Sequence, residues 1–249
     1  MSTGNIGLVG FGRFGRLVHR HLPAGKVAGV YDRDPEKLAG LADAATLEQV
    51  LEGQYVILAT PISAIDAICR QISPALRTGQ VVIDTCSVKQ YPVDCMSSRL
   101  PDDVQILGTH PLFGPDSGRD GIGGMKIAVC PVRIDSANYD CIRNFFQGLG
   151  LEIIETTPQE HDRRLARTQA IFHLISQALK ELDWRGQRLS TPGPDAFYRL
   201  AETVQNDTSE LFRDMEQRNR YAGAARREFI SKLVEIDEIL ARGDMPGTA

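Results

Sequence analysis

The sequence predicts an α/β protein, with a doubly wound, mostly parallel sheet followed by an all-helical C-terminal domain. Up to about residue 155, short apolar runs rich in β-branched residues alternate with segments of helical period, which is typical of βαβ units. After Thr157-Pro158 no β-rich run occurs, and apolar residues recur at spacings of three and four to the end of the chain. We therefore expect a first domain at residues 1–157 and a helical domain at residues 158–249.

Each strand of the first domain is predicted where apolar and β-branched residues run together, and each helix where apolar residues recur at helical spacing. The predicted strands cover residues 6–9, 27–31, 55–59, 81–84, 105–108, 126–130 and 151–155. The helices predicted between them cover residues 13–22, 35–41, 47–52, 62–75, 88–99 and 136–149. Connections this short between parallel strands place helices on both faces of a doubly wound sheet.

The second domain is predicted to consist of helical segments only. They cover residues 159–184, 195–216 and 222–242, with a break at 186–194 where glycine and proline occur. Apolar residues such as Leu174, Ala178 and Leu182 recur every four positions on the first segment. Such a stripe must be buried against the first domain or against a second copy of the chain, and we expect a homodimer through these helices.

The composition is that of a globular protein without a nucleic-acid or membrane signature. The 28 Lys and Arg residues are outnumbered by 32 Asp and Glu, and a net charge of -4 does not favour binding to a phosphate backbone. The apolar runs are far shorter than the roughly 18 to 20 residues that span a bilayer, and the N-terminus does not resemble a signal peptide. Five cysteines at irregular spacing form no metal-binding pattern, so we expect free thiols, no metal site and a cytoplasmic protein.

The first predicted strand runs directly into a glycine-rich turn and then a helix. The turn reads Gly10-Phe11-Gly12-Arg13-Phe14-Gly15, the G-x-G-x-x-G pattern in the strand, turn and helix context of a Rossmann-type dinucleotide site. Gly10 permits the tight turn, Gly12 lets the backbone approach a pyrophosphate, and Gly15 allows close packing of helix on strand. The helix N-terminus offers N–H groups to the phosphates. We expect these residues to bind a cofactor; the alternative is a plain glycine-rich turn.

An acidic residue stands where such a site binds the adenosine ribose. Asp32 ends the second predicted strand, and its carboxylate would accept hydrogen bonds from the ribose hydroxyls and repel a 2′-phosphate, which favours NAD. Arg33 follows directly, and a guanidinium there stacks on adenine or pairs with a 2′-phosphate. NAD is therefore the favoured cofactor, and NADP stays open.

Polar residues follow three further strands at the carboxyl edge of the sheet, where the cofactor crevice is expected. Thr60, followed by Pro61, is expected to contact the nicotinamide ribose, with a helix N-cap as an alternative role. Ser87 follows the next strand and His110 the one after it. Considered alone, Ser87 would be a helix cap and His110 a loop histidine. Considered together at a nicotinamide crevice, they are predicted to form an acid–base pair.

These segments together resemble one enzyme family. The set GFGRFG, ATP, DTCSVK, GTHPLFGPDSG and EHDRRLARTQAIFH resembles the prephenate and arogenate dehydrogenases of tyrosine biosynthesis over essentially the whole chain, in the form of the plant-like arogenate branch. The resemblance implies a Rossmann domain for NAD or NADP and a helical domain that completes the substrate site and forms a dimer. It also implies an oxidative decarboxylation of arogenate to tyrosine, of prephenate to 4-hydroxyphenylpyruvate, or of both.

The resemblance implies roles for three residues of the first domain. His110 matches the catalytic histidine, which binds the ring hydroxyl and takes up its proton, as an imidazole titrating near neutral pH can do. Ser87 matches the serine that hydrogen-bonds this histidine. Lys89 belongs to the SVK motif and is expected at the substrate, with a surface or helix-start lysine as the alternative.

The helical domain is expected to supply further substrate contacts. His161, Gln169 and His173 lie on one face of the first helix at four-residue spacing. Gln169 matches a substrate-site glutamine, His161 begins the HD pair that Asp162 completes, and His173 is interpreted as a core histidine. Asp207 aligns with an acidic residue associated with recognising the arogenate ammonium; a helix-capping aspartate is the alternative.

Some features of the family are absent, and other protein classes stay open. The sequence lacks the G-G-H-P-x-A-G-T loop and S-H-L-P-H helix of many bacterial members, and four arginines are candidates for binding the substrate carboxylate: Arg163, Arg164, Arg167 and Arg213. One alternative is a β-hydroxyacid dehydrogenase or imine reductase, but Lys180, near the far end of its helix, is poorly placed as the catalytic lysine of the former. Another is a nonenzymatic nucleotide-sensing module. The preferred substrate, the preferred cofactor and feedback by tyrosine are not decided by the sequence.

Overall fold

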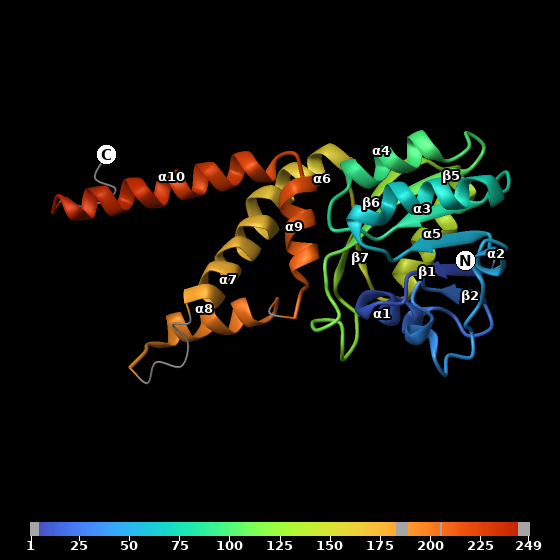
Figure 1. The fold of residues 1–249 in the computed structure, drawn as a ribbon, viewed down its shortest axis with the longest axis horizontal. Helices are drawn as coiled ribbons and strands as arrows, with labels where there is room; N and C mark the ends of the chain where they lie inside the picture. Colours follow the sequence, from blue (N-terminus) through green and yellow to red (C-terminus); the bar gives the residue numbers. More distant parts are fainter. Residues whose placement is uncertain (1–4, 183–188, 205, 244–249) are drawn as a thin grey trace. The chain divides into compact units, whose positions relative to one another are not determined.

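The computed structural model describes residues 5–182, 189–204 and 206–243 (Figure 1). Contacts divide the chain into two compact units, Met1–His161 and Asp162–Ala249, and each is treated by itself below. The end of the predicted helix at residues 183–184 and part of the break predicted at 186–194 lie outside the described residues. No helix in the described ranges is long and apolar enough to cross a membrane.

The first unit is built on a seven-stranded sheet with the order β2-β1-β3-β4-β5-β6-β7. The strands are β1 (Ile6–Val9), β2 (Val27–Tyr31), β3 (Tyr55–Leu58), β4 (Val81–Asp84), β5 (Gln105–Pro111), β6 (Lys126–Arg133) and β7 (Glu152–Glu155). All neighbouring strands are parallel except β5 and β6, which are antiparallel. The predicted fold class, a mostly parallel sheet followed by helices, is confirmed.

The antiparallel pair explains the largest difference from the predicted strands. β5 was expected to end at Gly108, but it continues because Thr109, His110 and Pro111 pair with β6 at Val129, Ala128 and Ile127. His110 is therefore a buried strand residue, 3% exposed, and the alternative of a loop histidine is wrong. A strand fixes a side chain more firmly than a loop does.

Helices and short 3-10 turns connect the strands. They are α1 (Arg13–His21), η1 (Pro35–Leu38), α2 (Leu47–Val50), η2 (Ile62–Ala64), α3 (Ile65–Ile72), η3 (Ser73–Ala75), α4 (Gln90–Arg99) and α5 (Ser136–Gly148). The helix predicted at residues 35–41 is only the 3-10 turn η1: Asp34 caps its start by accepting a hydrogen bond from the Glu36 N–H, and Gly40 follows with a φ of 75°. A left-handed glycine of this kind ends helical structure.

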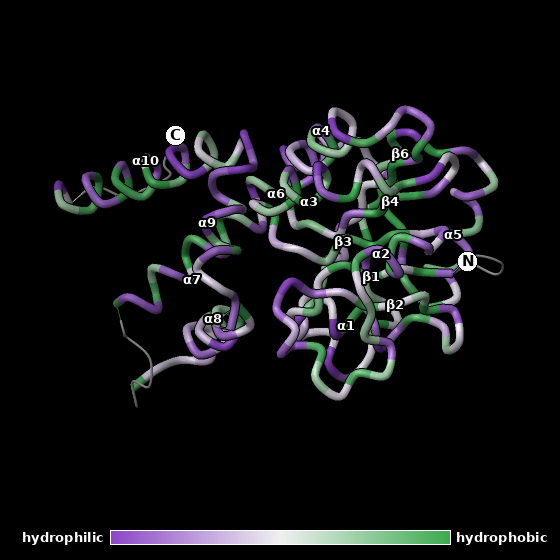
Figure 2. The backbone as a smooth tube through the Cα atoms, turned by 45° about the vertical axis from the view of Figure 1, so that its right-hand side comes forward, coloured by the Kyte–Doolittle hydropathy of each residue, from purple (hydrophilic) through white to green (hydrophobic). Residues whose placement is uncertain are grey.

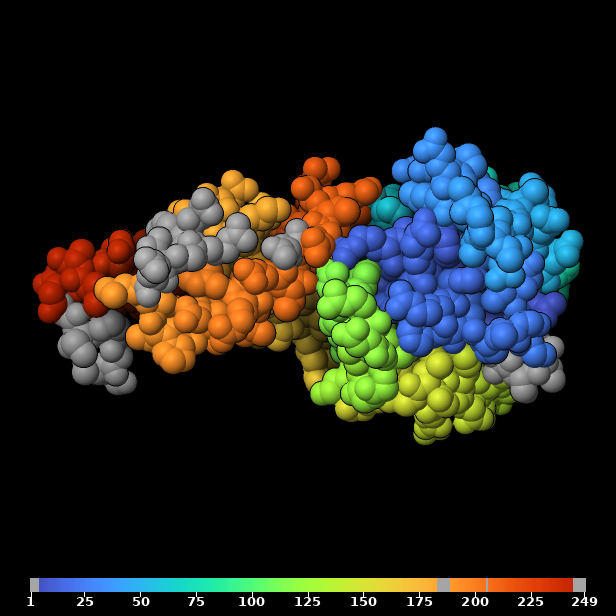
Figure 3. Space-filling view, turned by 90° about the horizontal axis from the view of Figure 1, so that it is seen from below, coloured from blue at the N-terminus to red at the C-terminus, as the bar shows by residue number. Residues whose placement is uncertain are grey.

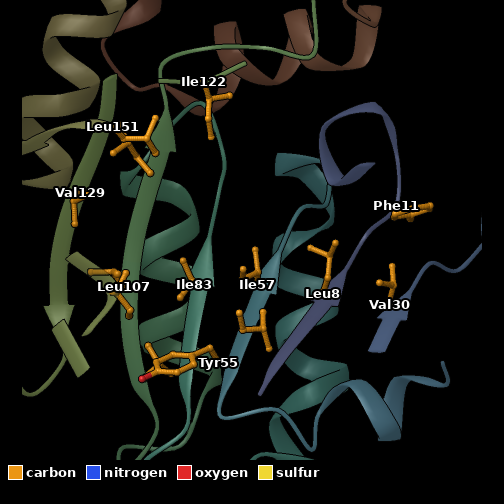
Figure 4. Close-up of a cluster of buried hydrophobic side chains, with 14 residues drawn as sticks. Leu8, Phe11, Val30, Tyr55, Ile57, Ile83, Leu107, Ile122, Val129 and Leu151 are labelled. Atoms are coloured by element: carbon orange, nitrogen blue, oxygen red, sulfur yellow. The ribbon is translucent and has the colours of Figure 1, made fainter. Parts of the chain in front are cut away.

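The core of this unit lies on the sheet. Figure 4 shows Leu8, Ile57, Ile83 and Leu107 side by side on successive strands, and each is at most 6% exposed. Burial of each such side chain stabilises the fold by about 1.5 to 3 kcal/mol. These β-branched and aliphatic residues are the ones from which the strands were predicted, because a strand covered on both faces is apolar along its length.

A buried ion pair joins the carboxyl ends of β4 and β5. Asp84 and Lys89 are both fully buried and form an ion pair with each other. The Lys89 ammonium also donates to the Thr109 carbonyl, and the Thr109 hydroxyl donates to the Asp84 carbonyl at 2.6 Å. Buried charges need an opposite charge of this kind, because an unpaired one is strongly destabilising. The position of His110, the next residue along β5, therefore depends on this pair.

The second unit is helical in its described residues. The helices in this part of the chain are α6 (Pro158–Leu165), which begins in the first unit, a π-helical turn (Ala166–Ala170), α7 (Ile171–Leu182), α8 (Pro192–Glu202), α9 (Ser209–Arg218) and α10 (Ala222–Ala241). The single helix predicted from residue 159 is thus interrupted by the π turn, and the segment predicted at 195–216 is two helices, because Thr208 caps a new start by accepting from the Leu211 N–H.

Small residues let α10 approach the π turn closely. Ala166 and Ala170 pack against Ala222 and Ala225, and all four are at most 8% exposed. Further along α10 lie exposed apolar residues, and the alternation of apolar and polar segments along this helix is visible in Figure 2. The second unit therefore has a small core of its own and an apolar surface.

Candidate active site

The glycine-rich turn of the first unit has the geometry of a phosphate cradle. Gly10 has a φ of +100°, and a Cβ atom there would lie 2.4 Å from the Ala59 carbonyl oxygen; a Cβ on Gly15 would lie 2.1 Å from the Gly10 oxygen. A Cβ on Gly12, in contrast, would meet no atom within 4 Å. The space in front of Gly12 is therefore open at the N-terminus of α1, where no side chain caps the helix. A pyrophosphate fits this arrangement.

The Asp32 carboxylate is held at the edge of this cradle. Its Oδ2 accepts a hydrogen bond from the Phe11 N–H at 2.7 Å, and its Oδ1 accepts from the Asp34 N–H at 2.9 Å. Burial opposes ionisation of Asp32, but these bonds and the Lys37 ammonium hold its pKa below the usual value. Asp32 is therefore ionised at neutral pH and able to accept from ribose hydroxyls, while Arg33 beside it is exposed.

Thr60 offers a buried hydroxyl at the end of β3. The Oγ1 atom of Thr60 is buried and has no hydrogen-bond partner among the described residues. Thr60 does not cap a helix, because the N-cap of η2 is Pro61 and carries no side-chain bond. The alternative role of Thr60 as an N-cap is therefore wrong. An unpaired buried hydroxyl at this edge suits a cofactor contact, since buried polar groups are otherwise almost always paired.

Arg13 and the loop after β5 are joined beside the cradle. The Arg13 guanidinium donates to Asp116 at 2.7 Å, and Arg20 donates to the Arg119 carbonyl at 3.2 Å. The space-filling view shows this loop, in green, against the blue N-terminal region (Figure 3). Phe14 lines an apolar cavity over the sheet together with other side chains of α1 and α5. The cofactor contacts expected of Arg13 and Phe14 stay predictions.

Two buried histidines form the centre of the site. His110 Nδ1 and His161 Nε2 are 2.9 Å apart, and the two residues are 3% and 2% exposed. One ring must donate and the other accept, so the tautomers of the two neutral rings are coupled. Burial, His161 and the Lys89 ammonium lower the pKa of His110 well below its usual value. His110 is therefore neutral at pH 7 and able to take up a proton.

The residues expected around His110 are arranged differently from the prediction. Ser87 is half-buried and makes no hydrogen bond to His110 in the described structure; the observed partner is His161, which was expected at the substrate. Nor is Ser87 the cap of α4, whose N-cap is Lys89. His161 lies 51 positions from His110 in the chain, and no local pattern relates the two.

Lys89 lies in the interior of the first unit, where its contacts are with the protein itself. Its side chain is fully buried and its ammonium binds Asp84 and the Thr109 carbonyl. The alternative of a surface lysine is therefore wrong. Lys89 is instead the N-cap residue of α4, in agreement with the alternative of a helix-start lysine. The substrate contact expected of Lys89 stays a prediction.

In the second unit, α7, α8 and α9 surround a pocket that contains Asp207 and His173. The Asp207 carboxylate lies 3.8 Å from His173 Nδ1, and Lys180 and Tyr198 also line the pocket. Burial lowers the pKa of His173 to about 4, so the ring is neutral at pH 7 and the contact is not an ion pair. Asp207 does not cap α9, because Thr208 does.

The other predicted residues of the helical part are placed separately. Gln169 is half-buried in the π turn and is not among the pocket residues. Asp162 is buried, and its carbonyl accepts a hydrogen bond from Asn219 at 2.8 Å. A π turn inserts an extra residue into a helix and often occurs at functional sites. It also shifts the face on which Gln169 and His173 were expected to continue from His161.

The candidate arginines do not converge on a site within the second unit. Arg163 stacks on the Tyr221 ring at 5.6 Å, Arg167 lies 3.7 Å from Glu228, and Arg213 is exposed on α9. Arg164 is also exposed. None of the four is singled out as the carboxylate ligand.

The comparison with known families matches this arrangement. The model of the family described as "Prephenate dehydrogenase, nucleotide-binding domain" matches residues 14–155, more than half of the chain. The chain belongs to the prephenate dehydrogenase family. The predicted resemblance is confirmed, and the matched segment contains α1 from its second residue on, Asp32, Thr60, Ser87 and His110.

Individual relatives agree with this assignment. Arogenate dehydrogenase 1 of Arabidopsis thaliana, a chloroplastic protein, is 28% identical over 83% of this chain and 34% of its own length. Arogenate dehydrogenase 2 of the same plant is 26% identical over 85% of this chain and 63% of its own length. The chain thus spans a third to somewhat under two thirds of these relatives.

A solved structure shows the same fold. The prephenate dehydrogenase of Aquifex aeolicus, in complex with hydroxyphenyl propionate and NAD+, superposes with a TM-score of 0.74 at 21% identity, covering 98% of this chain and 92% of that one. At this identity the match concerns the fold.

The geometry of Gly12 separates nucleotide binding from folding. In a Gly12→Ala variant the added methyl group enters open space, so the melting temperature stays unchanged while NAD+ binding, measured by isothermal titration, weakens by at least about tenfold. Gly148→Ala is the matched control, because a Cβ there also meets no atom but lies in α5. NAD+ affinity equal to that of the wild type in Gly12→Ala would contradict the cradle.

Proposed function

We propose that this protein catalyses the oxidative decarboxylation of arogenate to tyrosine, of prephenate to 4-hydroxyphenylpyruvate, or of both, with NAD or NADP as the cofactor. The observation that carries the proposal is the neutral, buried His110, hydrogen-bonded to His161 in the same unit as the nucleotide cradle. Membership of the prephenate dehydrogenase family and the names of the two plant relatives support it.

The reaction requires the protein to supply a base and to hold the substrate and the cofactor in fixed positions. A bound nicotinamide supplies the acceptor for a hydride from the ring carbon that bears the 4-hydroxyl. His110 accepts the hydroxyl proton on Nε2, which turns the C–O bond into a carbonyl; the ring carboxylate then leaves as carbon dioxide, and its electron pair makes the ring aromatic. The neutral form of His110 is the one that this step requires.

His161 has a defined part in this proposal. With its Nε2 accepting from His110 Nδ1–H, it leaves the Nε2 lone pair of His110 free for the substrate proton. It therefore acts as a positioning residue through His110. Ser87, also proposed as a catalytic residue on family resemblance, would meet the substrate or cofactor rather than His110 in this arrangement.

The test of the proposed activity is a matrix of initial rates with arogenate and prephenate against NAD+ and NADP+. Because the pKa of His110 lies well below 6.5, kcat/KM is expected to stay constant as pH falls through 6.5 and to decline only at lower pH. His110→Asn is expected to lose turnover while still binding NAD+. Absence of turnover by the wild type with every combination would favour a nucleotide-sensing module, and a decline centred at or above pH 6.5 would contradict the lowered pKa.

Asp207 is proposed to favour arogenate over prephenate. Arogenate carries an ammonium where prephenate carries a ketone, and a half-buried carboxylate favours the cation. The structure supports this by placing the Asp207 carboxylate in a pocket beside the neutral ring of His173. Gln169 is proposed as a further substrate contact.

Asp207→Asn is therefore expected to lower kcat/KM for arogenate by about tenfold or more and to raise it for prephenate, because the amide has no charge to pair with the ammonium. Asp195→Asn, at the exposed start of α8 and outside the pocket, is the matched control. An unchanged ratio of the two kcat/KM values in Asp207→Asn would remove this role.

We also propose a homodimer formed through the helical unit. Ile230, Leu233, Val234 and Leu240 of α10 are between 46% and 57% exposed. A row of exposed aliphatic side chains of this kind marks an association surface. Sedimentation is expected to give the mass of a dimer, and Leu233→Glu to lower it toward a monomer; a monomer mass for the wild type at all concentrations would contradict the proposal.

Two further observations support proposals for the preferred cofactor and for the cellular compartment. NAD is proposed as the preferred cofactor because the ionised Asp32 is placed to accept from ribose hydroxyls. All five cysteines are free thiols, which is typical of a reducing compartment such as the cytoplasm. A β-hydroxyacid dehydrogenase or imine reductase is not favoured by the family match.

A further inference from the structure

We propose that Lys37 is a determinant of cofactor specificity, which neutralises Asp32 and thereby admits the 2′-phosphate of NADP beside NAD. This inference rests on the proposed function in that it requires a dinucleotide at the glycine-rich cradle. Lys37 lies outside the sequence motifs, and its position is seen only in the folded chain.

Lys37 and Asp32 form an ion pair whose two members differ in burial. Lys37 Nζ lies 3.4 Å from Asp32 Oδ1, and the two side chains are 42% and 8% exposed. Asp32 is thus the fixed partner, already held by the N–H groups of Phe11 and Asp34, and Lys37 is the partner that can turn toward solvent. A pair at 3.4 Å with one exposed member is loosely made, so its ammonium can be redirected at little cost.

The backbone around Lys37 is fixed even though its side chain is not. η1 (Pro35–Leu38) starts at the Asp34 cap. The Arg16 guanidinium donates to the Lys37 carbonyl at 2.8 Å and lies 4.5 Å from the centre of the Phe11 ring. The turn that carries Lys37 is therefore tied to α1 and to the cradle, which keeps the ammonium within reach of the nucleotide ribose.

The charges near the expected ribose site determine how Lys37 affects the binding of NAD and of NADP. An ionised carboxylate at the ribose attracts the 2′-hydroxyl of NAD and repels a 2′-phosphate. With Lys37 beside it, the negative charge of the carboxylate is offset, and Arg16 and Arg33 are further exposed cations on the neighbouring segments. The Asp34 carboxylate is engaged in capping its own turn. A 2′-phosphate can thus share the Lys37 ammonium with Asp32, whereas NAD does not need it.

The experiment measures dissociation constants of NAD+ and NADP+ for the full chain by isothermal titration. Lys37→Met is expected to raise the Kd of NADP+ by about tenfold or more, because one charge-assisted contact is lost. The Kd of NAD+ is expected to change by less than about twofold. Lys37→Arg is expected to retain NADP+ binding. Lys26→Met is the matched control, because it removes the same charge just before the opposite end of β2. Melting temperatures verify that each variant folds.

The outcomes separate this inference from the proposed function. An equal ratio of NADP+ to NAD+ affinity in the wild type and in Lys37→Met would overturn the inference and leave the dehydrogenase proposal standing. Equal losses of NADP+ affinity in Lys37→Met and Lys26→Met would also overturn the inference, since they would show an effect of net charge alone. Failure of the wild type to bind either nucleotide would instead overturn the proposed function.

Discussion

The buried ion pair between Asp84 and Lys89 is the interaction on which the site depends. Burial raises the pKa of Asp84, and the Lys89 ammonium opposes that rise. Two charges removed from water tolerate little displacement, because each loses its opposite charge when the other moves. Since Lys89 also binds the Thr109 carbonyl, the ends of β4 and β5 are held together, and the same ammonium helps to lower the pKa of the adjacent His110. This pair thus holds the strand end that carries the base, and its ammonium adds to the effect of burial and of His161 on the pKa of His110.

The nucleotide cradle and this base belong to one rigid arrangement of strand ends. Gly10 follows β1, Asp32 follows β2, Thr60 lies just after β3 and His110 is near the end of β5, all at the carboxyl edge of one parallel run of strands. The open space at Gly12, the ionised Asp32 and the Thr60 hydroxyl, which has no partner among the described residues, are three different observations that the proposed dinucleotide site would explain. A dinucleotide satisfies all three, which explains why the family match and the geometry agree.

Local patterns predicted much of the fold, and long-range contacts account for what they missed. The strands β1, β2 and β4 were placed to the residue, because apolar runs bounded by turns leave few alternatives. The extension of β5 could not be foreseen, since it depends on antiparallel pairing with β6 across an intervening loop. The glycines and Asp32 were found because their roles are local. The contacts of His161 with His110 and of Lys89 with Thr109 were not predicted, because each joins residues far apart in the sequence.

The central claim is that His110 is a neutral base whose tautomer is set by His161, and nitrogen NMR of the histidine rings tests it most directly. With ¹⁵N-labelled protein at pH 7, and with His110→Asn and His161→Asn to assign the signals, the account predicts that His110 carries its proton on Nδ1 and has an unprotonated Nε2. It predicts that the Nδ1 proton is shared with His161 Nε2. A His110 that is doubly protonated at pH 7, or that carries its proton on Nε2, would contradict it.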